Sequence, residues 1–126
     1  MDYLLDTHVV IWAISDVKKL SLRSKNILQD KSNKCFESII SLWEIGIKYS
    51  LGRLELSAEL SEIFSIIKQS DLEILPVSPD HFLTVSKLEF HHNDPFDRLL
   101  IGQAISEKLI ILSKDKEFKK YGISIW

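Results

Sequence analysis

Short apolar runs of strand length alternate with longer segments of helical spacing along this chain. The short runs predict five strands at residues 3–5, 34–37, 72–77, 109–112 and 122–125. In the segments between them, apolar positions recur every three or four residues, as on the buried face of a helix. The predicted helices lie at residues 9–14, 21–30, 38–51, 57–67, 78–90, 94–108 and 115–119.

Residues with marked preferences for helix ends support these boundaries. Ser21 and Ser57 are placed to cap two of the helices, because a serine hydroxyl accepts a hydrogen bond from a free amide of the first turn. Pro79 and Pro95 each stand in a predicted first turn, where proline is favoured. Gly52 is placed to end the long apolar helix before it.

The alternation of strands and helices is typical of an α/β fold, in which helices cover both faces of a parallel sheet. A chain of 126 residues suits one domain, and no linker or internal repeat divides it. We therefore predict a single domain over residues 1–126. In such folds, functional groups gather at the carboxyl ends of the strands.

Two aspartates follow predicted strands at this edge. Asp6 comes directly after the first strand, and Asp115 comes three residues after the strand at 109–112. Either side chain can instead serve as a helix cap, Asp6 together with Thr7, which would be a purely structural role. Their common position at one sheet edge favours a shared site.

A third carboxylate, Glu44, lies on a helix that is apolar over most of its surface. At 3.6 residues per turn, Glu37, Ser41, Glu44 and Lys48 fall on one narrow polar stripe. Because so apolar a helix is buried over most of its circumference, the stripe faces either a strip of solvent or a pocket. The pattern alone leaves both possibilities open.

A fourth carboxylate, Asp97, belongs to the first turn of the helix predicted after Asp94. Its charge favours the helix dipole there, which is a sufficient structural role. Asp97 nevertheless shares a face with Ile101 and Ala104, which are core-type residues, whereas Arg98 lies on a different face. The carboxylate is therefore expected to point inward.

Four inward carboxylates need a positive partner, because an unpaired buried charge is costly. Mg²⁺ and Mn²⁺ prefer such oxygen donors and keep several waters. A cation of this kind activates a water molecule and stabilises charge on a phosphate. Asp6, Glu44, Asp97 and Asp115 together therefore indicate a metal-dependent enzyme.

Composition limits the other classes. The net charge of −2 gives no strong nucleic-acid signature, although removing four metal-bound carboxylates from the count leaves +2 for the remainder. No signal peptide or membrane-spanning run is visible, so we expect a cytoplasmic protein with no membrane partner. Cys35 is the only cysteine, which precludes an intrachain disulfide, and we predict that it is a small buried hydrophobe.

Histidines and tryptophans give weaker signals. His91 and His92 together with Asp94 are potential zinc ligands, but adjacent histidines point apart and no zinc motif accompanies them, so a solvated loop is expected. His8 can line the site or stack near a base. The three tryptophans are expected in the core rather than as platforms for bases. No P-loop, dinucleotide-binding or nucleophile-elbow motif occurs.

Several segments, in unbroken order from Asp2 to Trp126, match one family. They are Leu4-Leu5-Asp6-Thr7-His8, Ser41-Leu42-Trp43-Glu44-Ile45, Asp94-Pro95-Phe96-Asp97-Arg98-Leu99-Leu100, Ser113-Lys114-Asp115, Tyr121-Gly122 and Ile125-Trp126. In these segments the chain resembles PIN domains, above all the VapC-type toxins of type II toxin–antitoxin systems. Ser113 stands where that family often has Thr, which keeps the hydroxyl. Gly102 stands where Ala is usual, which should weaken its helix slightly.

The resemblance implies a three-layer α/β/α sandwich with a central parallel sheet. It implies a Mg²⁺- or Mn²⁺-dependent endoribonuclease whose acidic site is built from Asp6, Glu44, Asp97 and Asp115. It also implies a homodimer that a cognate antitoxin neutralises, with the antitoxin's tail in the groove near the site.

The corresponding hypothesis is hydrolysis of RNA phosphodiester bonds by metal-activated water. Asp6 and Asp97 would be the first metal ligands, and Glu44 and Asp115 would complete the site directly or through water. Residues expected to contact the substrate, or to orient Asp115 or a bound water, are Ser113, Lys48, Arg53 and His8.

Three alternatives remain at this stage. A receiver-like signalling domain has a similar size and an acidic Mg²⁺ pocket, but it needs a phosphoacceptor after a central strand, where Asp80 is poorly placed. A non-catalytic PIN module would act only by binding. A DNA-directed nuclease would use the same carboxylates, which do not choose between the two sugars.

Overall fold

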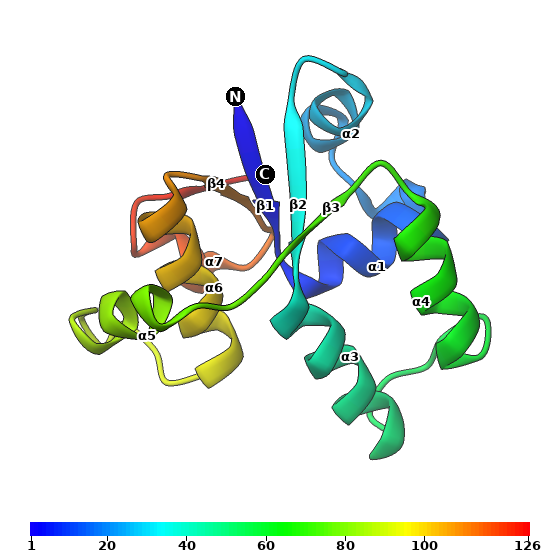
Figure 1. The fold of residues 1–126 in the computed structure, drawn as a ribbon. Coiled ribbons are helices and arrows are strands. Elements are labelled where there is room, and N and C mark those ends of the chain that lie inside the picture. Colours follow the sequence, from blue (N-terminus) through cyan, green and yellow to red (C-terminus); the bar gives the residue numbers. More distant parts are fainter.

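The computed structural model describes all 126 residues, which form a five-stranded parallel sheet between layers of helices (Figure 1). The strands are β1 (Asp2–Leu5), β2 (Lys34–Ser38), β3 (Glu73–Leu75), β4 (Ile110–Leu112) and β5 (Ser124–Ile125). They lie in the order β3-β2-β1-β4-β5, and every neighbouring pair is parallel. The predicted α/β/α fold with its central parallel sheet is confirmed.

Seven α-helices and one 3₁₀ helix connect the strands. They are α1 (Thr7–Ser15), η1 (Val17–Lys19), α2 (Leu22–Gln29), α3 (Ile39–Ser50), α4 (Leu60–Gln69), α5 (Pro79–Ser86), α6 (Pro95–Glu107) and α7 (Lys116–Lys119). Figure 1 shows α1, α2 and α4 on one side of the sheet, α5, α6 and α7 on the other, and α3 extending from the end of β2. None of the helices combines the length and the apolar character that a membrane crossing requires.

Two hydrophobic cores fill the space between the sheet and its helices. Alternation along β1 sends Leu5 into one core, with Val10 of α1 and Ile63 of α4, and sends Leu4 into the other, with Leu100 of α6. All five of these aliphatic side chains are nearly or fully buried. The central strand is therefore covered on both faces, and its carboxyl end is fixed from two sides.

Two helix boundaries differ from the predicted ones by three residues or more. Helix α4 begins at Leu60 with Glu59 at its N-cap, so Ser57 does not cap it. The preceding Leu56 and Ala58 pack against the first core, which holds this stretch outside the helix. Helix α5 ends at Ser86 rather than near Phe90, since the chain then turns into the loop that leads to α6.

Gly102 lets α5 and α6 approach closely. A Cβ at this position would lie 2.4 Å from Val85 Cγ2 and 3.1 Å from the carbonyl oxygen of His81. Any larger residue must therefore push α5 away. Glycine lowers the helix propensity of α6, as expected, but only glycine leaves room for this close contact.

Candidate active site

Asp6 is fixed at the carboxyl end of β1 by three hydrogen bonds. Its Oδ1 accepts from the backbone amides of His8, at 2.7 Å, and Val9, at 3.2 Å, as the N-cap of α1. Its Oδ2 accepts from the buried hydroxyl of Ser113 beyond β4. Burial raises the pKa of Asp6, while the hydrogen bonds from Ser113 and Val9 and the charge of His8 work in the opposite direction.

Ser113 joins two of the predicted carboxylates. Its hydroxyl donates to Asp6 and accepts from the backbone amide of Asp115 at 3.0 Å. Asp115 then caps α7, where its Oδ1 accepts from the amide of Glu117 at 2.9 Å. Neighbouring parallel strands β1 and β4 thus place both aspartates at one edge of the sheet.

Glu44 comes from α3 and is 3% exposed. Its Oε1 accepts from the Thr7 hydroxyl at 2.6 Å, and its Oε2 is 2.5 Å from the Lys48 ammonium one turn later. The polar stripe predicted on this helix therefore faces a pocket. Burial lowers the pKa of Lys48, but the bond to Glu44 and the nearby negative charges outweigh it, and the net shift is upward.

Asp97 lies in the first turn of α6 and points inward, with 20% of its side chain exposed. Its pKa is raised to about 8, first by burial and then by the charges of Asp94, Glu44, Asp6 and Asp115. All four carboxylates raise its pKa because they lie near it. The shift therefore reports on the concentration of negative charge around Asp97.

These side chains line one cavity of about 130 Å³ at the carboxyl edge of the sheet. The lining includes every predicted carboxylate, the predicted Lys48 and His8, and three residues that were not predicted: Thr7, Asp94 and Phe118. Arg53, expected to contact phosphate, is exposed beyond α3 and does not line the cavity.

Of these residues, Asp94 has a usable signal in the sequence. The sequence predicts Asp94 as the N-cap of α6, and it does accept from the amides of Phe96 and Asp97 at 2.9 and 3.1 Å. A residue three positions before an inward aspartate lies on nearly the same side of the helix, which is a usable signal. Thr7 directly follows Asp6, but its bond to Glu44 depends on the tertiary contact between α1 and α3.

His92 does not lie in the solvated loop that the sequence predicts. Its side chain is 12% exposed, its Nδ1 lies 2.9 Å from the Tyr121 hydroxyl, and its Nε2 lies 3.4 Å from Asp97 Oδ2. Buried Arg98 holds the loop in place by donating to the carbonyl oxygens of Leu88, Glu89 and His92. These contacts order the loop beside Asp97.

The donor set fits a hard divalent cation held partly through water. No three of the His, Cys, Asp and Glu side chains stand in a geometry that could hold a metal ion by themselves. Mg²⁺ commonly binds through one or two carboxylates and keeps several waters, so it needs no such protein cage. Oxygen donors around a small cavity match this mode of binding, and the absence of sulfur donors fits the same ions.

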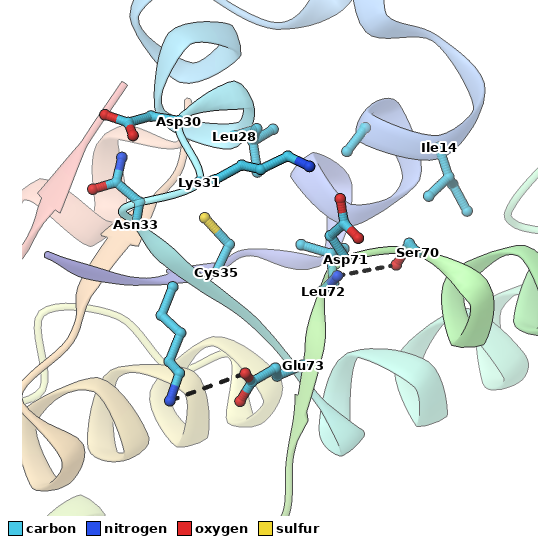
Figure 2. A pocket seen from close by; sticks show the side chains of 12 residues that line it. Ile14, Leu28, Asp30, Lys31, Asn33, Cys35, Ser70, Asp71, Leu72 and Glu73 are labelled. Atoms are coloured by element: carbon cyan, nitrogen blue, oxygen red, sulfur yellow. Dashed lines mark hydrogen bonds and ion pairs between the residues drawn. The ribbon is translucent and has the colours of Figure 1, made fainter.

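A larger cavity of about 470 Å³ lies at the opposite edge of the sheet (Figure 2). Cys35 lines it near the amino end of β2, and Lys34 lies 4.0 Å from Glu73 at its rim. Cys35 is buried, as predicted, and burial followed by the charge of Asp2 raises the pKa of its thiol to about 11. The thiol is therefore unreactive at neutral pH.

The tryptophans differ from the prediction that all three are core residues. Trp12 and Trp126 are half-buried and pack against the first core, with ring centroids 5.9 Å apart. Trp43, on α3, is 62% exposed and contacts Phe96 at 5.7 Å. The Trp43 side chain faces outward and that of the next residue, Glu44, faces inward, because adjacent side chains on a helix point about 100° apart.

Comparison with known proteins places the chain in a family. Among solved structures, it resembles VapBC2 of Rickettsia felis bound to a DNA fragment from its promoter, with 25% identity, a TM-score of 0.74, and coverage of 100% of this chain and 99% of that one. VapBC-1 of nontypeable Haemophilus influenzae gives 19% identity and a TM-score of 0.71, with coverage of 100% and 96% respectively. FitAcB of Neisseria gonorrhoeae gives 17% identity and a TM-score of 0.64, with coverage of 100% and 96%. No curated protein sequence matches the chain.

The family model described as "PIN domain" matches residues 3–123. That range contains all of the carboxylates around the acidic cavity. The chain therefore belongs to the PIN-domain family.

Proposed function

We propose that this protein is a Mg²⁺- or Mn²⁺-dependent endoribonuclease and the toxin of a type II toxin–antitoxin pair. The observation that carries the proposal is the cavity where Asp6, Glu44, Asp94, Asp97 and Asp115 converge at the carboxyl edge of a PIN-domain sheet. So dense a set of carboxylates is unfavourable without a cation. Hydrolysis of a phosphodiester is the chemistry that such a cation supports best.

In the proposed mechanism, Asp6 and Asp97 would hold the cation, which would supply positive charge for an attacking water and for the phosphate. Ser113 keeps Asp6 oriented through its hydroxyl. Thr7 and Lys48 each donate a hydrogen bond to one carboxylate oxygen of Glu44. Glu44 therefore acts mainly by holding Lys48 at the cavity, and any contact of Glu44 with the cation is made through a water molecule. Lys48 is placed to contact a phosphate oxygen, and exposed Asp115 is free to accept a proton.

An antitoxin partner is supported by the similar structures, several of which are VapBC toxin–antitoxin complexes. An antitoxin tail laid along the groove beside the acidic cavity would block access to the carboxylates. The receiver-like alternative has no support in the fold comparison, which returns PIN-type proteins. The non-catalytic PIN module and the DNA nuclease remain outcomes of the experiments below.

Cleavage of cellular RNA tests the proposed activity. The purified protein is expected to cut total RNA at discrete sites with Mg²⁺ or Mn²⁺ and to stop cutting in excess EDTA. Asp6→Asn should lower the rate by at least about 100-fold, because losing a ligand exceeds the 10–100-fold cost of losing an outer-shell partner. Asn is as good an N-cap as Asp, so α1 keeps its start.

Asp80→Asn, on exposed α5, is the matched control and should cleave like the parent. Mapped RNA ends and a parallel single-stranded DNA substrate identify the nucleic acid. Cleavage of DNA alone would replace the proposal with a DNA nuclease. Equal cleavage by Asp6→Asn and the parent would remove the acidic cavity from the mechanism.

We also propose a homodimer formed through the outer face of α3. Ile39 and Trp43 on this helix and Leu51 at its C-cap are 43%, 62% and 59% exposed, and Phe96 of α6 lies beside Trp43. An exposed apolar stripe of this kind is typical of an association surface.

Trp43→Glu should convert a dimer into a monomer in light scattering, whereas Phe82→Glu on α5 should leave the dimer intact. A monomeric parent protein at micromolar concentration would contradict the proposal.

A further inference from the structure

A second cavity adjoins the acidic one and is lined by residues of a different kind. Its volume is about 260 Å³, and it shares Asp6, His8 and Asp115 with the acidic cavity. Trp12 and Lys114 complete its wall. A group bound there would therefore lie directly beside the carboxylates.

Two aromatic rings from successive turns of α1 border this cavity. The ring centroids of His8 and Trp12 are 5.9 Å apart with an interplanar angle of 42°. Trp126 contacts Trp12 edge-on at 5.9 Å and supports the indole from the other end of the chain. His8 is exposed and Trp12 half-buried, so part of each ring is accessible to a ligand.

Lysines stand beside these rings, and the second cavity is less acidic than the first: its one lysine shares the lining with two carboxylates, whereas Lys48 shares that of the acidic cavity with five. Lys114 lies in the wall of the second cavity, and the Lys19 ammonium lies 6.0 Å from the Trp12 ring centroid. A third cavity of about 370 Å³ continues from His8 and Trp12 past Lys19, whose ammonium lies 3.7 Å from Asp16, to Leu54 and Glu55. The hollows thus form a path that leads from the carboxylates past aromatic rings and lysines.

We infer that His8, Trp12 and Lys114 form a nucleotide subsite, in which the base next to the scissile phosphate stacks on the two rings while Lys114 contacts its phosphate. This inference deepens the proposed function and rests on it. Aromatic side chains combined with cationic groups along a groove are the means by which proteins hold single-stranded nucleic acid.

Binding measured without cleavage tests the subsite. A fluorescently labelled single-stranded RNA of eight nucleotides is titrated with the protein in EDTA, and its anisotropy is followed. Trp12→Leu should weaken binding by about tenfold, because stacking contributes about 1–3 kcal/mol per base. Trp12→Phe keeps an aromatic face and should bind within about twofold of the parent. Lys114→Met should lower the slope of log K against log salt by about 1.

Phe82→Leu, an exposed aromatic of α5 far from the path, is the matched control and should bind like the parent. RNAs with one abasic position, moved along the strand, locate the stacked base. The RNA that lacks the stacked base should bind the parent more weakly than intact RNA does. The Trp12→Leu protein should bind this RNA and intact RNA with equal affinity.

Equal RNA affinity of the parent and a folded Trp12→Leu protein would overturn the subsite. So would a loss of affinity for the antitoxin peptide without any loss for RNA, which would make the groove a peptide site. Since binding is measured in EDTA, a protein that binds RNA through Trp12 but never cleaves it would contradict the nuclease proposal alone.

Discussion

Asp97→Asn is expected to abolish RNA cleavage and, in EDTA, to make the protein more stable than the parent. The carboxylate lies among Asp6, Glu44, Asp94 and Asp115 in one cavity. Removing its charge relieves repulsion that only a cation would otherwise offset. A residue that destabilises the free protein while enabling its chemistry is a common feature of active sites.

The pH dependence of this gain follows from the raised pKa of Asp97. The folded-state pKa is about 8, against an ordinary value of 3.8, with burial as the main cause. The contribution of Asp97 to stability is therefore fully present below about pH 4 and is lost as the pH rises through 8, because the folded state binds the proton more tightly. Asn does not titrate, so its advantage should grow between pH 4 and pH 8 to about 2–4 kcal/mol.

Thermal melts with and without metal check both halves of this prediction. In EDTA at pH 8 the variant should melt about 5–10 °C above the parent. Added Mn²⁺ should raise the melting temperature of the parent by mass action and leave that of the variant nearly unchanged. Asp80→Asn should follow the parent in both conditions. An Asp97→Asn protein that is less stable than the parent in EDTA would show that this carboxylate is structurally satisfied without a cation.

The parts of this fold that depend on local sequence were predicted well. Asp6, Ser21 and Asp94 cap helices as expected, because a capping side chain bonds an amide two or three residues away. The buried strands were visible as apolar runs, and the edge that they define placed Asp6 and Asp115 together. Both kinds of inference need only neighbours in the chain and one general rule about parallel sheets.

The parts that depend on distant contacts were predicted poorly. Thr7 meets Glu44 only because α1 packs against α3, and His92 is ordered only because Arg98 bonds the loop around it. Trp43 looks like a core residue by its composition, yet it faces outward because Glu44 occupies the inward position beside it. A hydrophobic pattern cannot rank two faces of a helix that is apolar all round.

Glu37 is the clearest case of this limit. Its position in the sequence fits both the strand predicted at residues 34–37 and a polar stripe with Ser41, Glu44 and Lys48 at helical spacing. The structure confirms the strand: Glu37 lies in β2, paired with Leu5 and Ile74, where its side chain is fully buried. Neither carboxyl oxygen has a hydrogen-bond partner. Burial alone raises its pKa from 4.5 to about 7, which is the expected response of an unpartnered carboxyl.

Glu37→Leu is expected to stabilise the protein at alkaline pH and to leave RNA cleavage unchanged. With a folded-state pKa of about 7, Glu37 contributes stability that is fully present below about pH 4.5 and is lost as the pH rises through 7. At pH 8 the ionised carboxyl costs about 3 kcal/mol, which leucine avoids. Urea unfolding at pH 5 and pH 8 measures this difference, and subtracting variant from parent isolates Glu37, since Asp97 titrates in both.

Glu73→Gln provides the matched control for Glu37→Leu. Glu73 lies exposed on the neighbouring strand, and the Lys34 ammonium is 4.0 Å from its carboxylate. Its unfolding should show the parent's pH dependence. If Glu37→Leu is less stable than the parent at pH 8, the buried carboxyl has a partner such as an internal water, and the cost assigned to it is wrong. If cleavage falls while stability rises, Glu37 serves the active site from beneath the sheet edge, and its burial is then a functional strain rather than a defect of packing.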